Sequence, residues 1–179
     1  MTPQTHRLRH ATVADGASLH ALVEACGTLE QNTAYAYLLL ASDFADTSVV
    51  AERLGGSGAL EGLVLGYRPP RRPDSVFVWQ VGVAPTARGL GLAGRLLDAF
   101  AGLTAELASP AGAPYPAPPR YLEATVTPSN DASIALFRGF ARRHGVPCEA
   151  QPWFEAAHFP RGAHEAEQMY RIGPLEKQS

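Results

Sequence analysis

Two glycines in one short segment have the spacing of an anion site built from backbone. Residues 79–96 predict an apolar strand that stops at Pro85, a turn through Arg88-Gly89-Leu90-Gly91, and a helix that starts directly after it. Glycines let the main chain approach a ligand, successive N–H groups point into one concavity, and the helix start adds partial positive charge. A plain strand-to-helix connection is the alternative, but it does not need two conformationally costly glycines. The segment is therefore predicted to bind a phosphate group.

The spacing of this turn narrows the choice of ligand. Arg88-x-x-Gly91-x-Ala93 is neither the dinucleotide-binding G-x-G-x-x-G nor the P-loop G-x-x-x-x-G-K-[ST] pattern. It resembles the (Arg/Gln)-x-x-Gly-x-(Gly/Ala) signature of the GNAT acetyltransferase family, where it likewise lies between an apolar strand and a long amphipathic helix. The resemblance implies acetyl-CoA as co-substrate. Its pyrophosphate would be held by Arg88, Gly89, Leu90, Gly91, Leu92 and Ala93.

The strand before the turn carries two further expectations. Residues 76–83 are apolar on both faces, which is typical of a central strand. Trp79 is by frequency a core residue, but its place just before the turn also fits a wall of the acceptor pocket. The resemblance implies that the backbone of Val81, Gly82 and Val83 meets the pantetheine arm and the thioester. A backbone N–H there could stabilise the oxyanion of a tetrahedral intermediate.

A polar stripe is predicted on the strand that follows later in the chain. Alternation places Tyr121, Glu123, Thr125 and Thr127 on one face, opposite an apolar face, so this face is expected to line a wet cleft. Glu123 is either an edge-strand charge or a pocket carboxylate that holds or deprotonates an amine. Thr125 shares its face and is a candidate for the same site.

The next helix has its own family pattern. Asn130-x-x-Ser133-x-x-Leu136-Phe137 resembles the GNAT helix Asn-x-x-Ala-x-x-Leu-Tyr, in which the Asn meets the cofactor. The resemblance implies that Asn130, Ser133 and Phe137 lie at acetyl-CoA. Phe137 stands where many members have a Tyr that can protonate the leaving thiolate, so solvent or another hydroxyl would have to supply that proton.

Four segments resemble one branch of the family, the L-2,4-diaminobutyrate acetyltransferases, which make the acetylated precursor of the compatible solute ectoine in osmotic stress. They are residues 29–40, 77–81, 123–130 and 164–174. The resemblance covers almost the whole chain. It implies transfer of acetyl to the γ-amine of L-2,4-diaminobutyrate. Another small diamine or amino acid as acceptor, or a catalytically silent acyl-CoA-binding module, are the alternatives.

This acceptor carries two amines and one carboxylate, and an amine must lose a proton before it attacks. The resemblance places Glu30 and Tyr35 on the acceptor side, although Glu30 could equally be a first-turn charge that complements a helix dipole. Tyr35 and Tyr37 are two residues apart, so they cannot share a helix face and one of them is expected in the core. The resemblance favours His164 as a substrate or general-base contact, with His158 a weaker candidate.

The elements that must position these residues follow in a definite order. The patterns predict an α/β fold with a central, mixed, mostly antiparallel sheet of six to seven strands and helices on both faces, as one GNAT domain over residues 1–179. Strands are expected at 7–11, 47–54, 59–67, 76–83, 121–127, 148–154 and 167–172. Helices are expected at 13–26, within 28–45, from the glycine turn to 107, and at 130–144, with a proline-rich exposed loop at 109–119.

Composition excludes several other classes. The net charge is −2 and Lys and Arg form no sustained run, so nucleic acid is not an expected partner, and Arg71-Arg72 is predicted to lie in a solvated loop. No segment is apolar enough to span a membrane. The isolated Cys26 and Cys148 favour a reduced cytoplasmic setting, a catalytic thiol has no support, and no metal site is expected. A homodimer is expected only by analogy with the fold.

Overall fold

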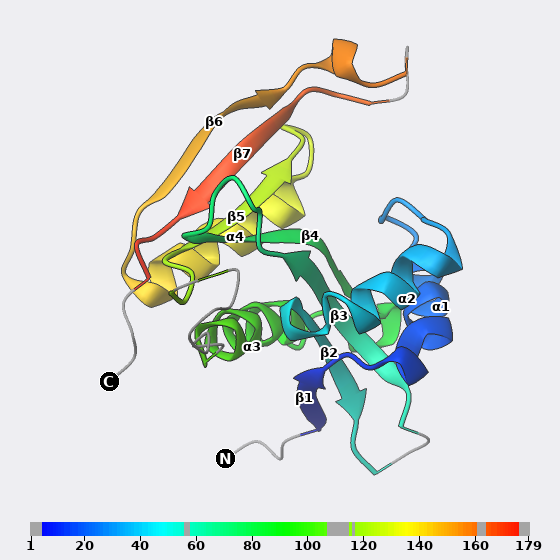
Figure 1. Cartoon of the computed structure of the whole chain (residues 1–179). Coiled ribbons are helices and arrows are strands. Elements are labelled where there is room, and N and C mark those ends of the chain that lie inside the picture. The colour runs from blue at the N-terminus through cyan, green and yellow to red at the C-terminus, as the bar shows by residue number, and fades with distance from the viewer. Residues whose placement is uncertain (1–4, 56–57, 107–114, 116, 161–163, 176–179) are drawn as a thin grey trace. The chain divides into compact units, whose positions relative to one another are not determined.

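A computed structural model describes residues 5–55, 58–106, 115, 117–160 and 164–175 (Figure 1). The strands are β1 (His6–His10), β2 (Ser48–Arg53), β3 (Leu60–Tyr67), β4 (Ser75–Val83), β5 (Tyr121–Val126), β6 (Cys148–Phe154) and β7 (Glu167–Ile172). The helices are α1 (Gly16–Cys26), α2 (Ala34–Ser42), α3 (Leu92–Glu106) and α4 (Asp131–His144). Single 3₁₀ turns lie at Val13–Asp15, Ala45–Thr47, Pro85–Ala87 and Ala156–His158.

The strands form a seven-stranded sheet in the order β1-β2-β3-β4-β5-β7-β6. β4 and β5 run parallel, whereas the β1–β2, β2–β3, β5–β7 and β7–β6 pairs are antiparallel. The predicted fold class, a mixed and mostly antiparallel sheet with helices, is confirmed. The described chain divides into two compact units, Met1–Tyr67 with Trp79–Leu107 and Arg68–Val78 with Ala108–Ser179, so β4 contributes residues to both. A single domain over 1–179 stays a prediction.

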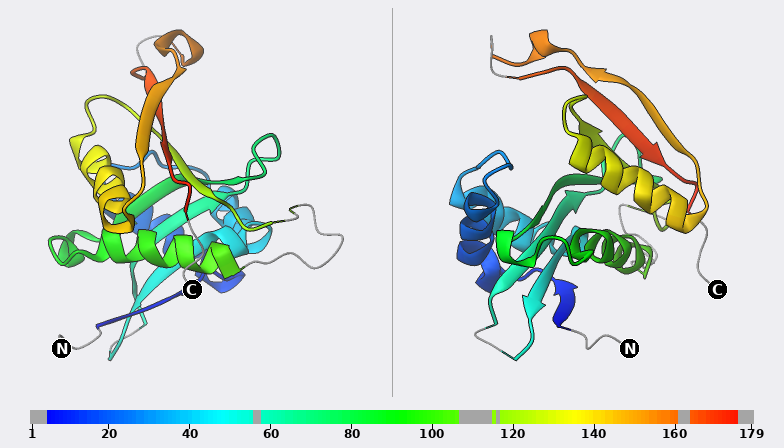
Figure 2. Two further views of the ribbon diagram at one scale, coloured as in Figure 1. Left: turned by 90° about the vertical axis from the view of Figure 1, so that its left-hand side faces the viewer. Right: turned by 180° about the vertical axis from the view of Figure 1, so that it is seen from behind.

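The first unit is a three-layer arrangement around β2 and β3. Helix α3 lies on one face of these strands, and α1 and α2 lie on the other (Figures 1 and 2). The helix residues Leu19, Tyr37 and Leu96 are completely buried, as is Val64 on β3. The prediction of helices on both faces is therefore confirmed for this unit.

Local signals set the ends of its first helices. Asp15 accepts hydrogen bonds from the backbone N–H and the hydroxyl of Thr12, as part of a capping box at the start of the helical segment expected at 13–26. Gly27 ends α1 with φ 66°, a conformation that glycine adopts without a Cβ penalty. The Thr33 hydroxyl accepts from the Ala36 N–H and starts α2, so the segment at 28–32 stays outside the helix.

The second unit packs α4 on one face of β5, β7 and β6 (Figure 2). The predicted apolar face of β5 is confirmed, because Leu122, Ala124 and Val126 are all buried. Gly145 ends α4, as predicted, with φ 65°. Most of the loop expected at 109–119 lies outside the described residues, as do two residues of the turn between β2 and β3.

Candidate active site

The glycine turn has the geometry of an anion cradle. Gly89 and Gly91 have φ of 76° and 69°, and a Cβ built on either would meet no atom within 4 Å, so the turn is open beside both residues. Among the described groups, none accepts a hydrogen bond from the amides of Gly89, Leu90 or Gly91. Helix α3 begins at Leu92, directly after the turn. Unpaired amides, open space and a helix start together fit the phosphates of coenzyme A.

The Arg88 side chain holds this turn in place. Its Nη2 donates to the Cys26 carbonyl at 2.7 Å and its Nε to the Val83 carbonyl at 3.3 Å. The guanidinium therefore ties the turn to the end of α1 and the end of β4, and the cradle itself is made by the backbone that follows. Burial raises the pKa of the Cys26 thiol, which disfavours the nucleophilic thiolate there.

A polar residue inside β4 fixes the segment that carries Glu30. The Gln80 side chain is 7% exposed, and its Nε2 donates to the Glu30 carbonyl at 2.7 Å. Its Oε1 is buried and has no partner among the described atoms. At Gly82, a Cβ would lie 2.8 Å from Leu29 Cδ1 and 3.0 Å from Cys26 Sγ, so a larger residue there would make these side chains shift. In the sequence Gln80 stands out only as a lone amide in an apolar strand, a pattern that predicts no function.

Three of the residues expected at the acceptor lie in the first unit with their side chains accessible. Tyr35 is 67% exposed and Trp79 37% exposed, and Glu30 is also exposed. Tyr37 is fully buried and its hydroxyl accepts from the Asn32 N–H at 3.2 Å. The expectation that one of the two tyrosines is a core residue is confirmed, and Tyr37 is that residue.

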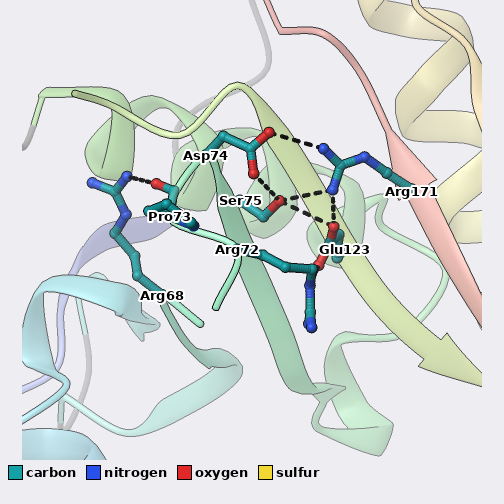
Figure 3. A network of polar contacts seen from close by, with 7 residues as sticks. All are labelled: Arg68, Arg72, Pro73, Asp74, Ser75, Glu123 and Arg171. Atoms are coloured by element: carbon teal, nitrogen blue, oxygen red, sulfur yellow. Dashed lines mark hydrogen bonds and ion pairs between the residues drawn. The ribbon is translucent and has the colours of Figure 1, made fainter. Parts of the chain in front are cut away.

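Glu123 lies at the centre of a polar network in the second unit (Figure 3). Its side chain is 1% exposed, and it accepts from Arg72 Nε at 2.7 Å, from the Ser75 hydroxyl at 3.0 Å, and from Arg171 Nη1. Arg171 also pairs with Asp74 at 3.0 Å. These donors occupy both carboxylate oxygens and place Glu123 among fixed cations. The arrangement suits an electrostatic anchor for neighbouring side chains better than a freely accessible base.

Arg72 is a residue whose environment was predicted wrongly from the sequence. The prediction that Arg71-Arg72 is a solvated pair holds for Arg71, which is exposed. Arg72 is half-buried, bonds to Glu123, and lies 5.1 Å from the centre of the Trp153 ring. Its partner is a buried carboxylate 51 residues later in the chain, and no local sequence pattern reports such a partner.

His164 is oriented by its immediate neighbours. Its ring stacks on Phe159 with centroids 4.2 Å apart, Nδ1 lies 2.8 Å from the Glu165 carbonyl oxygen, and Nε2 lies 3.6 Å from a Glu167 oxygen. A carbonyl oxygen only accepts, so Nδ1 must carry the proton and the lone pair of a neutral ring lies on Nε2. His158 is used differently, because its Nδ1 accepts from the Glu155 N–H at 3.0 Å in a local cap.

The remaining predicted site residues of the second unit differ in burial and in their contacts. The Asn130 side-chain oxygen accepts from the Ser133 N–H at 3.0 Å and caps α4. Phe137 is 2% exposed, so its ring packs in the core. Thr125 is half-buried in β5 and pairs in register with Met169. Asn130 and Ser133 lie at a helix start, where a ligand could approach.

Known proteins match this architecture. The sequence model of the Acetyltransferase (GNAT) family matches residues 17–140, which include the glycine turn. The chain belongs to the GNAT acetyltransferase family. The resemblance predicted from the turn is thereby confirmed, and the chain is an N-acetyltransferase by family.

Within the GNAT family, the chain is similar to enzymes with one name. The L-2,4-diaminobutyric acid acetyltransferase of Streptomyces avermitilis is 40% identical over 173 residues, covering 97% of this chain and 90% of that protein. The enzyme of the same name from Streptomyces coelicolor is 44% identical over 163 residues, covering 91% and 89%. Diaminobutyrate acetyltransferase EctA from Paenibacillus lautus, in complex with its substrate L-2,4-diaminobutyric acid and coenzyme A, has a TM-score of 0.81 at 32% identity. That match covers 98% of this chain and 99% of that chain.

The described residues hold neither a membrane span nor a metal cluster. No helix there is long and apolar enough to cross a membrane. In the same ranges, no three His, Cys, Asp or Glu side chains gather in a way that could hold a metal ion.

Proposed function

We propose that this chain transfers the acetyl group of acetyl-CoA to the γ-amine of L-2,4-diaminobutyrate and releases coenzyme A. The observation that carries the proposal is the match, over 98% of the chain, to an enzyme whose structure holds that diamine and coenzyme A. The open glycine turn at the start of α3 gives the proposal a physical basis, because it can bind the phosphates of the donor.

The reaction is a direct acyl transfer. The neutral amine attacks the thioester carbonyl, a C–N bond forms, and the carbonyl oxygen becomes an oxyanion. When the tetrahedral intermediate collapses, the C–S bond breaks, coenzyme A leaves as a thiolate, and the nitrogen gives up its proton to a base. The backbone of Val81, Gly82 and Val83 is proposed to face the thioester, where an N–H would stabilise the oxyanion.

We assign the proton acceptor to His164. Its Nδ1 faces a carbonyl oxygen, which leaves Nε2 with a lone pair, and Glu167 lies close enough to stabilise the imidazolium that forms. Glu30, Tyr35 and Trp79 are proposed to contact the acceptor, and all three are accessible. Glu123, surrounded by two guanidinium groups, is proposed to orient polar groups at the acceptor. Thr125 is proposed to line the same face of β5.

The co-substrate residues are proposed from the turn and from the start of α4. Gly89, Leu90, Gly91, Leu92 and Ala93 offer the backbone groups for the pyrophosphate, and Arg88 holds the turn through the carbonyls that it binds. Asn130 and Ser133 are proposed to approach the cofactor from the start of α4. Phe137 has no hydroxyl, so solvent or another hydroxyl protonates the leaving thiolate.

A coupled assay of coenzyme A release tests the function. The acceptors are L-2,4-diaminobutyrate, ornithine, lysine and diaminopropionate, and the product of the first is analysed by NMR for the site of acetylation. The highest kcat/KM with L-2,4-diaminobutyrate and acetyl on the γ-nitrogen are expected. Equal or better turnover of another diamine would show a different acceptor. Acetyl-CoA binding without any release of coenzyme A would show a silent module.

The assembly and the cellular setting are part of the proposal. We propose a single catalytic domain that forms a homodimer and works in the cytoplasm. Strand β6 supports self-association, because in the described sheet it pairs with β7 alone and most of its side chains are exposed. Light scattering of the purified protein would measure the mass, and a mass of one chain at micromolar concentration would reject the homodimer.

A further inference from the structure

Arg72 presents one edge of its guanidinium without a partner. Its Nε bonds to Glu123, but neither terminal nitrogen has a hydrogen-bond partner among the described residues. These nitrogens point away from the rest of the network (Figure 3). The side chain is 29% exposed, so a ligand can reach it. A guanidinium fork of this kind matches the two oxygens of a carboxylate.

The loop that carries Arg72 is held firmly, although its sequence is rich in proline. Arg68 is 6% exposed, and its Nη2 donates to the carbonyl of Pro73 and, at 2.7 Å, to the carbonyl of Ala117. The Tyr115 hydroxyl donates to the Arg68 carbonyl at 2.6 Å, and the Arg68 guanidinium lies over the Tyr115 ring. These contacts hold the backbone of the loop, and the bond from Nε to Glu123 holds the Arg72 side chain, which reduces the entropy lost when a ligand binds.

Arg72 is one of several partners of Glu123. Arg171 already pairs with that carboxylate, and the Ser75 hydroxyl donates to it as well. Two guanidinium groups therefore share the Glu123 carboxylate, and Asp74 balances the second charge through Arg171. The network is neutral overall, and the terminal nitrogens of Arg72 are hydrogen-bond donors that no described group occupies. The Trp153 ring centre lies 5.1 Å from the Arg72 guanidinium, so an aromatic side chain borders the cation.

We propose that Arg72 is a specificity-determining residue whose terminal nitrogens bind the α-carboxylate of the amino-acid acceptor. The inference rests on the proposed function and adds a receptor for the one acidic group of that substrate. Glu123 then acts as a positioning residue, because its bond to Nε fixes the plane of the fork. The enzyme can distinguish an amino acid from a simple diamine, which lacks the carboxylate.

The test compares two acceptors on matched variants. L-2,4-diaminobutyrate is measured beside its α-carboxamide, which keeps both amines and replaces the carboxylate by a neutral group. If the amide is not turned over, its inhibition constant is measured in place of its kcat/KM. R72Q is expected to lower kcat/KM for the amino acid about 10- to 100-fold, through a higher KM, and to change the value for the amide less than about threefold. R72K keeps the charge and loses the fork, so an intermediate loss is expected.

The control is R71Q, which removes the neighbouring exposed arginine and should match the wild type with both acceptors. Thermal melting shows whether R72Q folds, and R72K serves as the test if it does not. Equal losses for the acid and the amide in either variant would overturn the inference and leave the proposed function standing. A wild type that does not acetylate L-2,4-diaminobutyrate would reject the proposed function, and the inference with it.

Discussion

Replacing Gly91 by alanine separates the anion cradle from ordinary helix geometry. Gly91 has φ 69°, it is exposed, and a Cβ there would meet nothing within 4 Å. Gly145 after α4 has φ 65°, is also exposed, and has the same open space around its Cβ position. The two substitutions are therefore matched in backbone strain and in the absence of a clash. Only Gly91 lies in the proposed phosphate site.

The expected changes in melting temperature and in the KM for acetyl-CoA follow from this match. An alanine forced into the left-handed region costs about 1 kcal/mol at either position, so each variant should melt about 2–4 °C lower than the wild type. At Gly91 the new methyl group also occupies space that the phosphate needs. Loss of one charge-assisted hydrogen bond weakens binding about 10- to 100-fold. The KM for acetyl-CoA should rise by that factor in Gly91→Ala and stay unchanged in Gly145→Ala.

The assay is initial-rate kinetics with acetyl-CoA varied at saturating acceptor, combined with thermal melting of both variants without ligand. Equal melting temperatures with different KM values for acetyl-CoA would support the cradle. If Gly91→Ala bound acetyl-CoA as well as Gly145→Ala, the assignment of the turn to the phosphates would be refuted. A much larger loss of stability in one variant would refute the argument that the two sites are matched.

Three further predictions address other parts of the chain. Gln80→Leu removes the donor to the Glu30 carbonyl. The KM for the acceptor should therefore rise about fivefold, with the KM for acetyl-CoA unchanged. A parallel rise in both KM values would count against a role of Gln80 in positioning Glu30. His164→Asn should lower kcat about 10²- to 10⁴-fold with little change in melting temperature, and near-normal kcat would assign the base elsewhere. The Arg9 guanidinium lowers the pKa of Asp15 in the folded protein. The pair therefore stabilises the fold fully at pH values above the unfolded pKa of Asp15, about 4. This contribution is lost as the pH falls through the folded pKa. Asp15→Asn should therefore lower the unfolding free energy by about 2 kcal/mol at pH 7 and flatten the fall of that free energy as the pH drops below about 4. Urea titrations over a range of pH measure this, and an unchanged pH profile would contradict the pairing.

Much of the fold could be predicted because its signals are local. The cap at Thr12, the stops at Gly27 and Gly145, and the alternation of β5 all depend on residues within a few positions of one another. The four 3₁₀ turns were not predicted, because three-residue turns carry no periodicity that a sequence can show. The start of α2 at Ala34 depends on one hydroxyl at Thr33.

Some residues of the candidate site could be predicted from the sequence, and others could not. The glycine turn could be found because its chemistry lies in the backbone and the glycines are visible in the sequence. Gln80 and Arg72 could not be assigned, because their partners, the Glu30 carbonyl and the Glu123 carboxylate, are about fifty residues away in the chain. Glu123 was seen as a polar residue on an accessible face, and its burial among cations depends on loops and strands that meet only in the folded unit.

The sequence by itself determined the class of ligand and the family, because both depend on short patterns of glycines and of strand and helix periodicity. Tertiary structure alone decided which polar side chains hold the site together and which remain available to a ligand. The physical reason is that a buried charge must find a partner wherever the chain brings one. Arg88, identified from a phosphate-binding signature, binds two carbonyls through its guanidinium, and Arg72, predicted to be solvated, presents its free edge beside a buried carboxylate.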